Sequence, residues 1–277
     1  MISDRSTYEK EVLQPLLRLE QKKMGETFEL YDGVIGFKTG RTPKILISGC
    51  HHASEIYGTY EAILNFIENT THDVVVVPVV DVPNFCYYND QSVKYLSDHY
   101  EESRKICFVL DIIRGYKGMK PEKIKWQYGD IGAAKIIKKM SQIIEDCDLI
   151  IDLHNMCANQ YCLITCRTKK NNEQEYLENI LKKISERDEI YTGALGVKFK
   201  KLSEGLFESR NSKTINAYAS KKGIINLSLE VPVFSNLQVL RNFSELSEFN
   251  SFLLDYIISQ YIITYGEKNE TKNRRIW

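Results

Sequence analysis

Short apolar runs alternate with stretches of helical periodicity along most of the chain. The run at residues 73–82 is a continuous β-branched stretch, and the runs at 44–49 and 148–154 are similar but shorter. Such runs are typical of strands buried in a sheet. Between them, apolar residues recur every three or four positions at 54–70 and 132–147, which predicts two amphipathic helices.

The same alternation continues toward the carboxyl end. The further predicted elements are a strand at 161–166, a helix at 172–187, a strand at 223–231 and a final helix at 244–263. Strands separated by helices imply crossover connections. We therefore expect one α/β domain over 1–277, with its core at about 40–235. Its architecture would be three layers, α/β/α, around a mainly parallel, mixed sheet.

One region does not follow this pattern. Residues 83–131 contain many tyrosines and charges but show little clear periodicity. Long irregular segments in compact domains are often functional loops, so this segment is a candidate lid. A surface excursion with a short helix of its own is an equally good interpretation.

Composition excludes several classes of protein. Lys+Arg and Asp+Glu both number 37, so the net charge is zero and a nucleic-acid partner is not expected. The longest apolar run is too short to span a membrane, and the first residues lack the apolar core of a signal peptide. Seven cysteines without a CxxC pair favour free thiols in a reducing cytoplasm.

Three of the predicted strands end in residues that bind metals or move protons. His52 and Glu55 follow the strand at 44–49, His154 ends a second strand, and Glu230 ends a third. Ligands of open α/β sheets bind beyond the carboxyl ends of the strands. An isolated HxxE pattern is weak evidence, because chance matches are common. The joint occurrence at three strand ends is stronger evidence for one shared site.

The residue types suit a catalytic zinc centre. Such zinc ions take three imidazole or carboxylate ligands and leave a position for water, whose pKa falls to about 7. His52, Glu55 and His154 would form this set around one Zn²⁺ per chain. A closed structural zinc site is a weaker alternative, because such sites prefer four protein ligands, often cysteine.

A carboxylate beside the water would complete the chemistry by moving its proton. Glu230 is the candidate base; Glu204 and Glu208 are rivals, but neither ends an apolar strand. Asp152 lies two residues before His154, so both side chains share one face of a strand. Asp152 is either a second carboxylate that orients the imidazole or a buried polar residue with a backbone partner.

Three cysteines near His154 raise a different possibility. Cys157, Cys162 and Cys166 could form a separate metal site. Their spacing fits no standard zinc knuckle, and small buried thiols are the simpler interpretation.

The stretches "GCHHASE", "IIDLHN" and "LSLEVP" together resemble the zinc carboxypeptidase superfamily, and more closely its succinylglutamate desuccinylase/aspartoacylase branch. The resemblance spans about residues 40–235, although short motifs carry it. It implies that His52, Glu55 and His154 bind zinc and that Glu230 is the catalytic glutamate. Asn155, in "DLHN", resembles the aspartoacylase form.

The chain departs from that family at the substrate-binding arginine and after Glu230, among other places. The Asn-Arg pair that grips a substrate carboxylate has no clear counterpart; Arg104 and Arg114 are the candidates to polarise the scissile carbonyl, although either could be a surface arginine. Residues 231–277 resemble a helix and a tail, so we expect no separate C-terminal β domain.

These observations predict a zinc-dependent hydrolase that cleaves an amide bond next to a carboxylate. The substrate would be a small peptide, as for a carboxypeptidase, or an N-acyl amino acid, as for a deacylase. The alternative is a non-catalytic protein that binds such molecules on the same fold, and the unclear substrate arginine motivates it. The sequence does not determine the oligomeric state.

Overall fold

The structure is a computed structural model of the 277-residue chain. The residues it describes are 5–31, 33–42, 44–50, 58–80, 82, 85, 140–156, 159–168, 170–210, 214–233 and 241–266. The descriptions below concern these residues.

The described residues form a nine-stranded sheet with the strand order β1-β2-β4-β3-β5-β9-β6-β8-β7. The strands are β1 (Glu26–Tyr31), β2 (Val34–Lys38), β3 (Ile45–Gly49), β4 (Val75–Val77), β5 (Leu149–Met156), β6 (Cys162–Thr165), β7 (Phe199–Ser203), β8 (Leu206–Ser209) and β9 (Ile225–Pro232). The helices are α1 (Ser6–Tyr8), η1 (Glu9–Leu13), α2 (Gln14–Gln21), α3 (Tyr60–Asn69), α7 (Glu173–Ser185), α8 (Ile215–Lys221), α9 (Phe243–Tyr261) and η5 (Ile262–Gly266).

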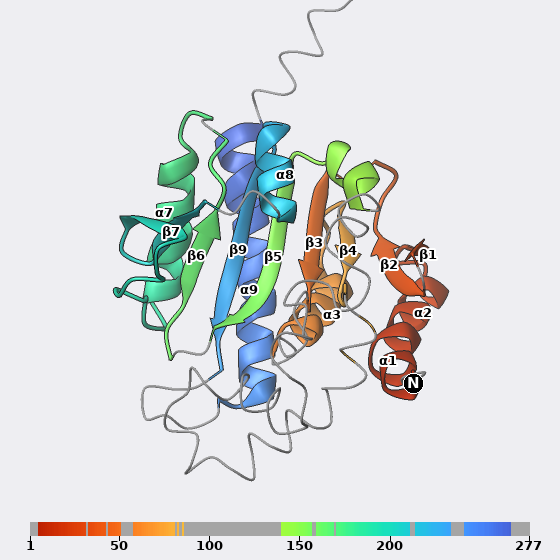
Figure 1. The fold of residues 1–277 in the computed structure, drawn as a ribbon. Coiled ribbons are helices and arrows are strands. Elements are labelled where there is room, and N and C mark those ends of the chain that lie inside the picture. Colours follow the sequence, from red (N-terminus) through yellow and green to blue (C-terminus); the bar gives the residue numbers. More distant parts are fainter. Residues whose placement is uncertain are drawn as a thin grey trace, which may run out of the picture.

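The centre of the sheet is parallel and its margins are mixed. Strands β4, β3, β5 and β9 run parallel, so the carboxyl ends of β3, β5 and β9 lie at the lower edge in Figure 1. On one side β1 and β2 add antiparallel strands. On the other, β6 is antiparallel to β9 and parallel to β8, which pairs with β7 in an antiparallel hairpin. This arrangement confirms the predicted mixed α/β fold.

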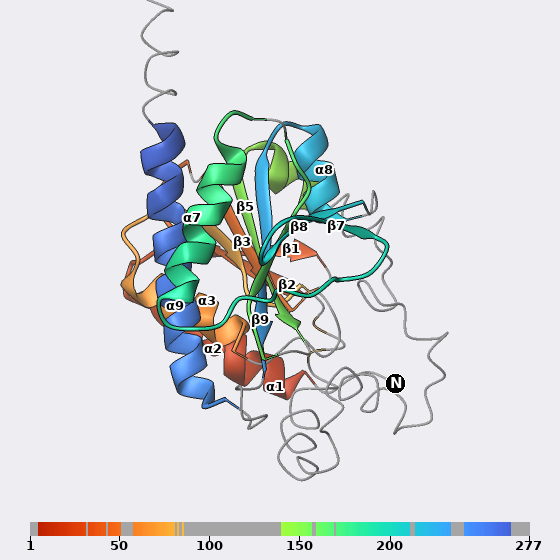
Figure 2. The same cartoon turned by 90° about the vertical axis from the view of Figure 1, so that its left-hand side faces the viewer.

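Helices cover both faces of the sheet. Figure 2 shows α8 on one side and α3, α7 and α9 on the other. Two contacts set which side chains point to each layer. Asn216 of α8 bonds to Ser228 of β9, whereas a Cβ placed on Gly49 of β3 would lie 3.0 Å from Ile63 of α3. Even-numbered positions at the ends of the central strands therefore face α8, and odd-numbered positions face the α3–α9 layer.

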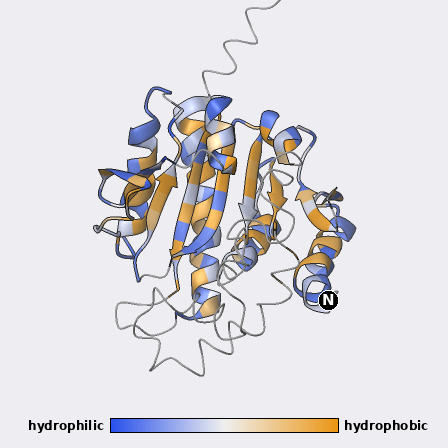
Figure 3. Ribbon diagram, viewed as in Figure 1, coloured by the Kyte–Doolittle hydropathy of each residue, from blue (hydrophilic) through white to orange (hydrophobic). Residues whose placement is uncertain are grey.

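The apolar runs of the sequence become the buried centre of the sheet (Figure 3). In β5, Leu149, Ile150, Ile151 and Leu153 are all fully buried. A strand covered on both faces needs apolar residues at successive positions, which explains the continuous run. Each such side chain contributes about 1.5–3 kcal/mol through removal from water.

Capping residues explain where α8 and α9 begin. The Asn242 side chain accepts hydrogen bonds from the N–H groups of Ser244 and Glu245 at the start of α9, and Thr214 accepts one from Ala217 at the start of α8. These bonds satisfy N–H groups that have no partner within the helix. Helix α9 matches the helix expected at 244–263.

The fold differs from expectation in detail. The predicted strand at 73–82 pairs only over β4, because Pro78 follows directly and has no N–H to donate to a ladder. After Pro78 the chain still runs beside the end of β3, since Val80 N–H donates to Gly49 O at 3.1 Å. The two marginal hairpins, β1–β2 and β7–β8, were not predicted; Gly33 and Gly205, with φ of 78° and 70°, lie in their turns.

Two predicted helices are described only in part. The helix expected at 54–70 is present as α3 from Tyr60, and that expected at 132–147 is helical at 140–145. Their earlier residues lie outside the described ranges. Among the helices that the structure describes, none combines the length and apolar character needed to cross a membrane.

Candidate active site

The structure describes four of the predicted site residues. These are Asp152, His154 and Asn155 on β5 and Glu230 on β9. The other four lie outside the described residues: His52, Glu55, Arg104 and Arg114. The same is true of the candidate lid at 83–131, apart from Phe85.

His154 and Glu230 lie side by side. They are Cα partners on the neighbouring parallel strands β5 and β9, so their side chains emerge on the same face of the sheet, the one that α8 covers further along. Both are half-buried, and the His154 side chain is 12% exposed. An imidazole and a carboxylate, far apart in the sequence, thus share the carboxyl edge where α/β sheets bind ligands.

Asp152 supports the imidazole from within the sheet. Its carboxyl is buried and accepts a hydrogen bond from the Ser48 hydroxyl of β3. Its other oxygen, Oδ2, lies 3.8 Å from His154 Nε2. That separation is an electrostatic contact, longer than a hydrogen bond. A carboxylate beside an imidazole orients the ring and increases its basicity.

A buried polar layer lies under this pair of residues. It consists of Ser48, Asp152 and Ser228, which are register partners on β3, β5 and β9, and Asn216 of α8. Asn216 Nδ2 donates to Ser228 Oγ at 2.8 Å, while its buried Oδ1 accepts no hydrogen bond from the residues that the structure describes. An unpaired buried acceptor costs about 1–3 kcal/mol and is expected mainly at functional sites. Histidine, carboxylates and an orphaned amide oxygen suit a site for a cation and its water.

Sequence reasoning missed three members of this polar layer. Ser48 and Ser228 each interrupt an apolar strand close to its end, as Asp152 does in β5. A small polar residue at the same place in three strands is a signal that could have found them. Asn216, on a helix, carries no comparable signal.

Asn155 occupies the alternate position on β5. It is buried, and its Nδ2 donates to Val231 O of β9 at 3.5 Å. Because successive side chains of a strand point to opposite faces, Asn155 faces away from the side of His154. Its bond joins the ends of β5 and β9.

The rival bases lie on other strands. Glu208 belongs to β8, which is separated from β9 by β6, and Glu204 lies in the turn between β7 and β8. Neither is a register neighbour of His154.

Burial disfavours the thiolate form of the two cysteines near the site that the structure describes. Cys162 is the antiparallel Cα partner of Glu230, and burial and the Glu230 charge raise the pKa of its thiol well above the usual range. Burial also raises the pKa of Cys166. Zinc binds the thiolate, which these shifts disfavour. Cys157 lies outside the described residues, and within those described no group of three or more His, Cys, Asp or Glu is placed to hold a metal.

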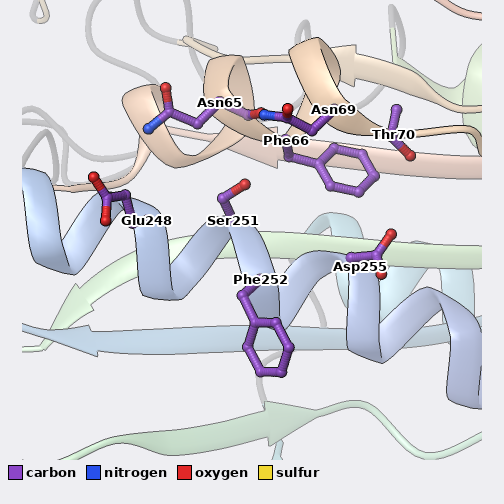
Figure 4. Close-up of a pocket in the computed structure, with 8 residues that line it drawn as sticks. All are labelled: Asn65, Phe66, Asn69, Thr70, Glu248, Ser251, Phe252 and Asp255. Carbon is purple, nitrogen blue, oxygen red and sulfur yellow. The ribbon is translucent and has the colours of Figure 1, made fainter.

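A separate groove lies in the opposite layer. It runs between α3 and α9 and has a volume of about 540 Å³. Figure 4 shows its lining, with Asn65, Phe66 and Asn69 on α3 and Asp255 on α9. The groove is therefore distinct from the site on the face that α8 covers.

No protein-family model and no curated protein matches the chain. Several solved structures are similar to it. A candidate metallopeptidase from Shewanella amazonensis SB2B superposes with a TM-score of 0.63 at 10% identity, over 91% of this chain and 93% of that one. Carboxypeptidase A from Helicoverpa armigera gives 0.57 at 13% identity, over 94% and 75%.

A third structure is the metallo-carboxypeptidase from Pseudomonas aeruginosa in complex with (2-guanidinoethylmercapto)succinic acid. Its TM-score is 0.54 at 10% identity, over 91% of this chain and 69% of that one. At sequence identities this low, the structural similarity establishes a shared architecture alone. The chain therefore has the carboxypeptidase-like α/β fold that metallopeptidases of this kind share.

Proposed function

We propose that this protein is a zinc-dependent hydrolase that cleaves an amide bond next to a carboxylate. The observation that carries the proposal is the pairing of His154 with Glu230 at the carboxyl edge of the sheet, with Asp152 beside the imidazole. His154 would hold one Zn²⁺ together with His52 and Glu55, which follow β3 in the sequence. Strand β3 is the neighbour of β5, so its carboxyl end reaches the same edge.

The bound zinc would supply a water that is nucleophilic near neutral pH. Glu230 would serve as the base for that water and as the proton donor to the leaving nitrogen. Its position one strand away from a zinc ligand suits this task, and its partial exposure leaves it accessible to substrate. Asp152, held by Ser48, keeps the His154 ring oriented.

The substrate carries a free carboxylate beside the scissile amide. It is either a short peptide or an N-acyl amino acid. The carboxypeptidase-like fold supports the proposal, and the Pseudomonas aeruginosa enzyme of that fold is seen with a substituted succinic acid, a carboxylate ligand. One of Arg104 and Arg114 would polarise the carbonyl that is attacked. Asn155 would stiffen the strand ends that carry His154 and Glu230.

Metal content tests the ligand set. Protein purified without added metal should contain about one zinc per chain by plasma emission spectroscopy, as a catalytic site with three protein ligands holds one ion. His154→Ala should lose it. His72→Ala is the matched control, because His72 pairs with Asp255 at 3.2 Å in the helical layer and should leave zinc unchanged. Full zinc in the His154→Ala protein would refute the ligand set.

A substrate panel separates catalysis from binding. Zinc-loaded protein is incubated with short peptides and N-acyl amino acids, and with the corresponding amides that lack the carboxylate. We expect product only from molecules with the free carboxylate. Tight binding without product over long incubation would favour the non-catalytic alternative.

A further inference from the structure

Buried contacts hold the described residues on either side of 51–57, the segment that contains His52 and Glu55. Cys50 precedes residues 51–57, and its Sγ lies 3.3 Å from Oγ1 of Thr59, which follows them. Cys50 is 1% exposed and Thr59 is fully buried. The side-chain contact therefore brings the entry and exit of the segment together inside the core.

Gly58, the first residue after the segment, packs directly against α9. Its φ of 69° favours glycine, and a Cβ there would come within 2.9 Å of Leu246 of α9. Its carbonyl oxygen accepts a hydrogen bond from Nδ2 of Asn250, also on α9, at 3.1 Å. Backbone conformation, close packing and a hydrogen bond thus all place the exit at one point on the helix.

Tyr161 determines which way the Asn250 amide points. The Tyr161 hydroxyl donates to Asn250 Oδ1 at 3.0 Å, so Nδ2 is directed toward Gly58. Both side chains are fully buried, where an unpaired polar group is costly. The backbone of Tyr161 is held on both sides, because its N–H donates to Glu189 O and its carbonyl accepts from Tyr191, each at 2.9 Å.

The same tyrosine lies beside the end of β9. It directly precedes Cys162, the register partner of Glu230. The Arg241 guanidinium lies 5.8 Å from the centre of its ring and is paired with Asp188 through two hydrogen bonds. Arg241 N–H donates to Val233 O, three residues after Glu230. These contacts, buried at Tyr161 and Asn250 and partly exposed at Arg241, connect Gly58 with the strand end that carries Glu230.

We propose that Tyr161 and Asn250 are positioning residues for the metal centre, and this inference rests on the proposed function. They hold Gly58 against α9, and Gly58 is the residue that directly follows the segment carrying the candidate ligands His52 and Glu55. Removing the Tyr161 hydroxyl leaves Asn250 Oδ1 without its partner, so the amide is no longer held in one orientation. Removing the Asn250 amide leaves Gly58 O without its donor on α9. Metal affinity falls when groups that orient the ligands are lost.

The experiment measures zinc affinity by competition with a chelator in the full-length protein. Tyr161→Phe, which deletes one hydroxyl, should weaken zinc binding about tenfold, the lower end of the range for groups that orient metal ligands. The matched control is Tyr176→Phe. Tyr176 of α7 is also buried, and its hydroxyl donates a hydrogen bond to Ile257 O of α9 at 3.1 Å. This hydroxyl is hydrogen-bonded to neither Gly58 nor Asn250. We expect its zinc affinity to stay within about twofold of wild type.

Asn250→Ala removes both hydrogen bonds and should weaken zinc binding at least as much. If that variant does not fold, Tyr161→Phe alone carries the test. Equal zinc affinities for Tyr161→Phe and Tyr176→Phe, whether both normal or both reduced, overturn the inference and leave the proposed function intact. Wild-type protein that binds no zinc overturns the proposed function, and the inference with it.

Discussion

At the carboxyl ends of β5 and β9, the two faces of the sheet differ in character although the same residue stretches form them. Leu153 and Leu229 face the layer of α3 and α9 and are fully buried. Their chain neighbours, His154 and Glu230, emerge on the other face and are half-buried. Because a strand alternates its side chains with a period of two, one short segment serves both core packing and chemistry. Substitutions at adjacent positions should therefore have separable effects.

The largest effect is expected on the polar face. Glu230→Gln removes the proton acceptor but keeps the shape of the side chain, so turnover should fall about 10²–10⁴-fold. Zinc content and the free energy of unfolding should change little. Steady-state kinetics with a hydrolysed member of the substrate panel measures the loss. A Gln variant with normal turnover would assign the base to another residue.

The neighbouring position on the apolar face should show the opposite behaviour. Leu229→Ala creates a cavity in the core and should lower the free energy of unfolding by about 2–5 kcal/mol in a urea titration. The zinc-loaded variant, as long as it remains folded, should have a turnover within a few-fold of wild type. A severe loss of turnover at normal stability would show that the two faces are not independent.

A smaller effect is expected in the polar layer beneath the site. Ser48→Ala deletes the hydrogen bond to the buried Asp152 carboxylate, so it should cost about 1–3 kcal/mol of stability and weaken zinc binding several-fold. Thr165→Val is the control: it loses a buried bond to Asn226 O at 2.8 Å, away from the ligands. Denaturation and chelator competition on both variants separate the two effects. If Ser48→Ala leaves the zinc affinity unchanged, Asp152 does not orient His154 for metal binding.

The layer of α3 and α9 also contains a buried carboxyl group, and its substitution should have the smallest effect on the candidate site. The buried carboxyl oxygens of Glu61 lie in the first turn of α3, and burial, with a smaller contribution from the charge on Glu11, raises the pKa of Glu61 well above its usual range. Folded protein therefore keeps this proton while unfolded chain releases it. The stabilisation is complete below the ordinary carboxyl pKa and is lost as the pH rises through the folded pKa.

Glu61→Gln should consequently be more stable than wild type at pH 7, by about 1.4 kcal/mol for each pKa unit that the pH lies above the unfolded value, up to the folded pKa. The difference should vanish near pH 4. Melting temperatures across this pH range test it. The control is Glu145→Gln, since Glu145 is exposed and the Tyr218 hydroxyl and Lys222 lower its pKa. An identical pH dependence for wild type and Glu61→Gln would contradict the prediction.

The sequence alone determined the elements of the central sheet and the residues at their ends. Continuous apolar runs predict β3, β5 and β9, and the polar residues that end two of them, His154 and Glu230, could be singled out from their positions in the chain. This prediction is possible because a strand buried on both faces requires apolar residues at successive positions. A polar residue at such a strand's carboxyl end is therefore conspicuous.

Only the tertiary structure decided which strands are neighbours and in what register. The pairing of His154 with Glu230, the antiparallel direction of β6 and the bonds from Tyr161 through Asn250 to Gly58 join segments that are far apart in the chain. Periodicity records how a residue relates to neighbours within a few positions, and it carries no information about partners in distant segments. Those partners are selected by how whole elements pack, which is why the candidate ligands were visible in the sequence and the groups that support them were not.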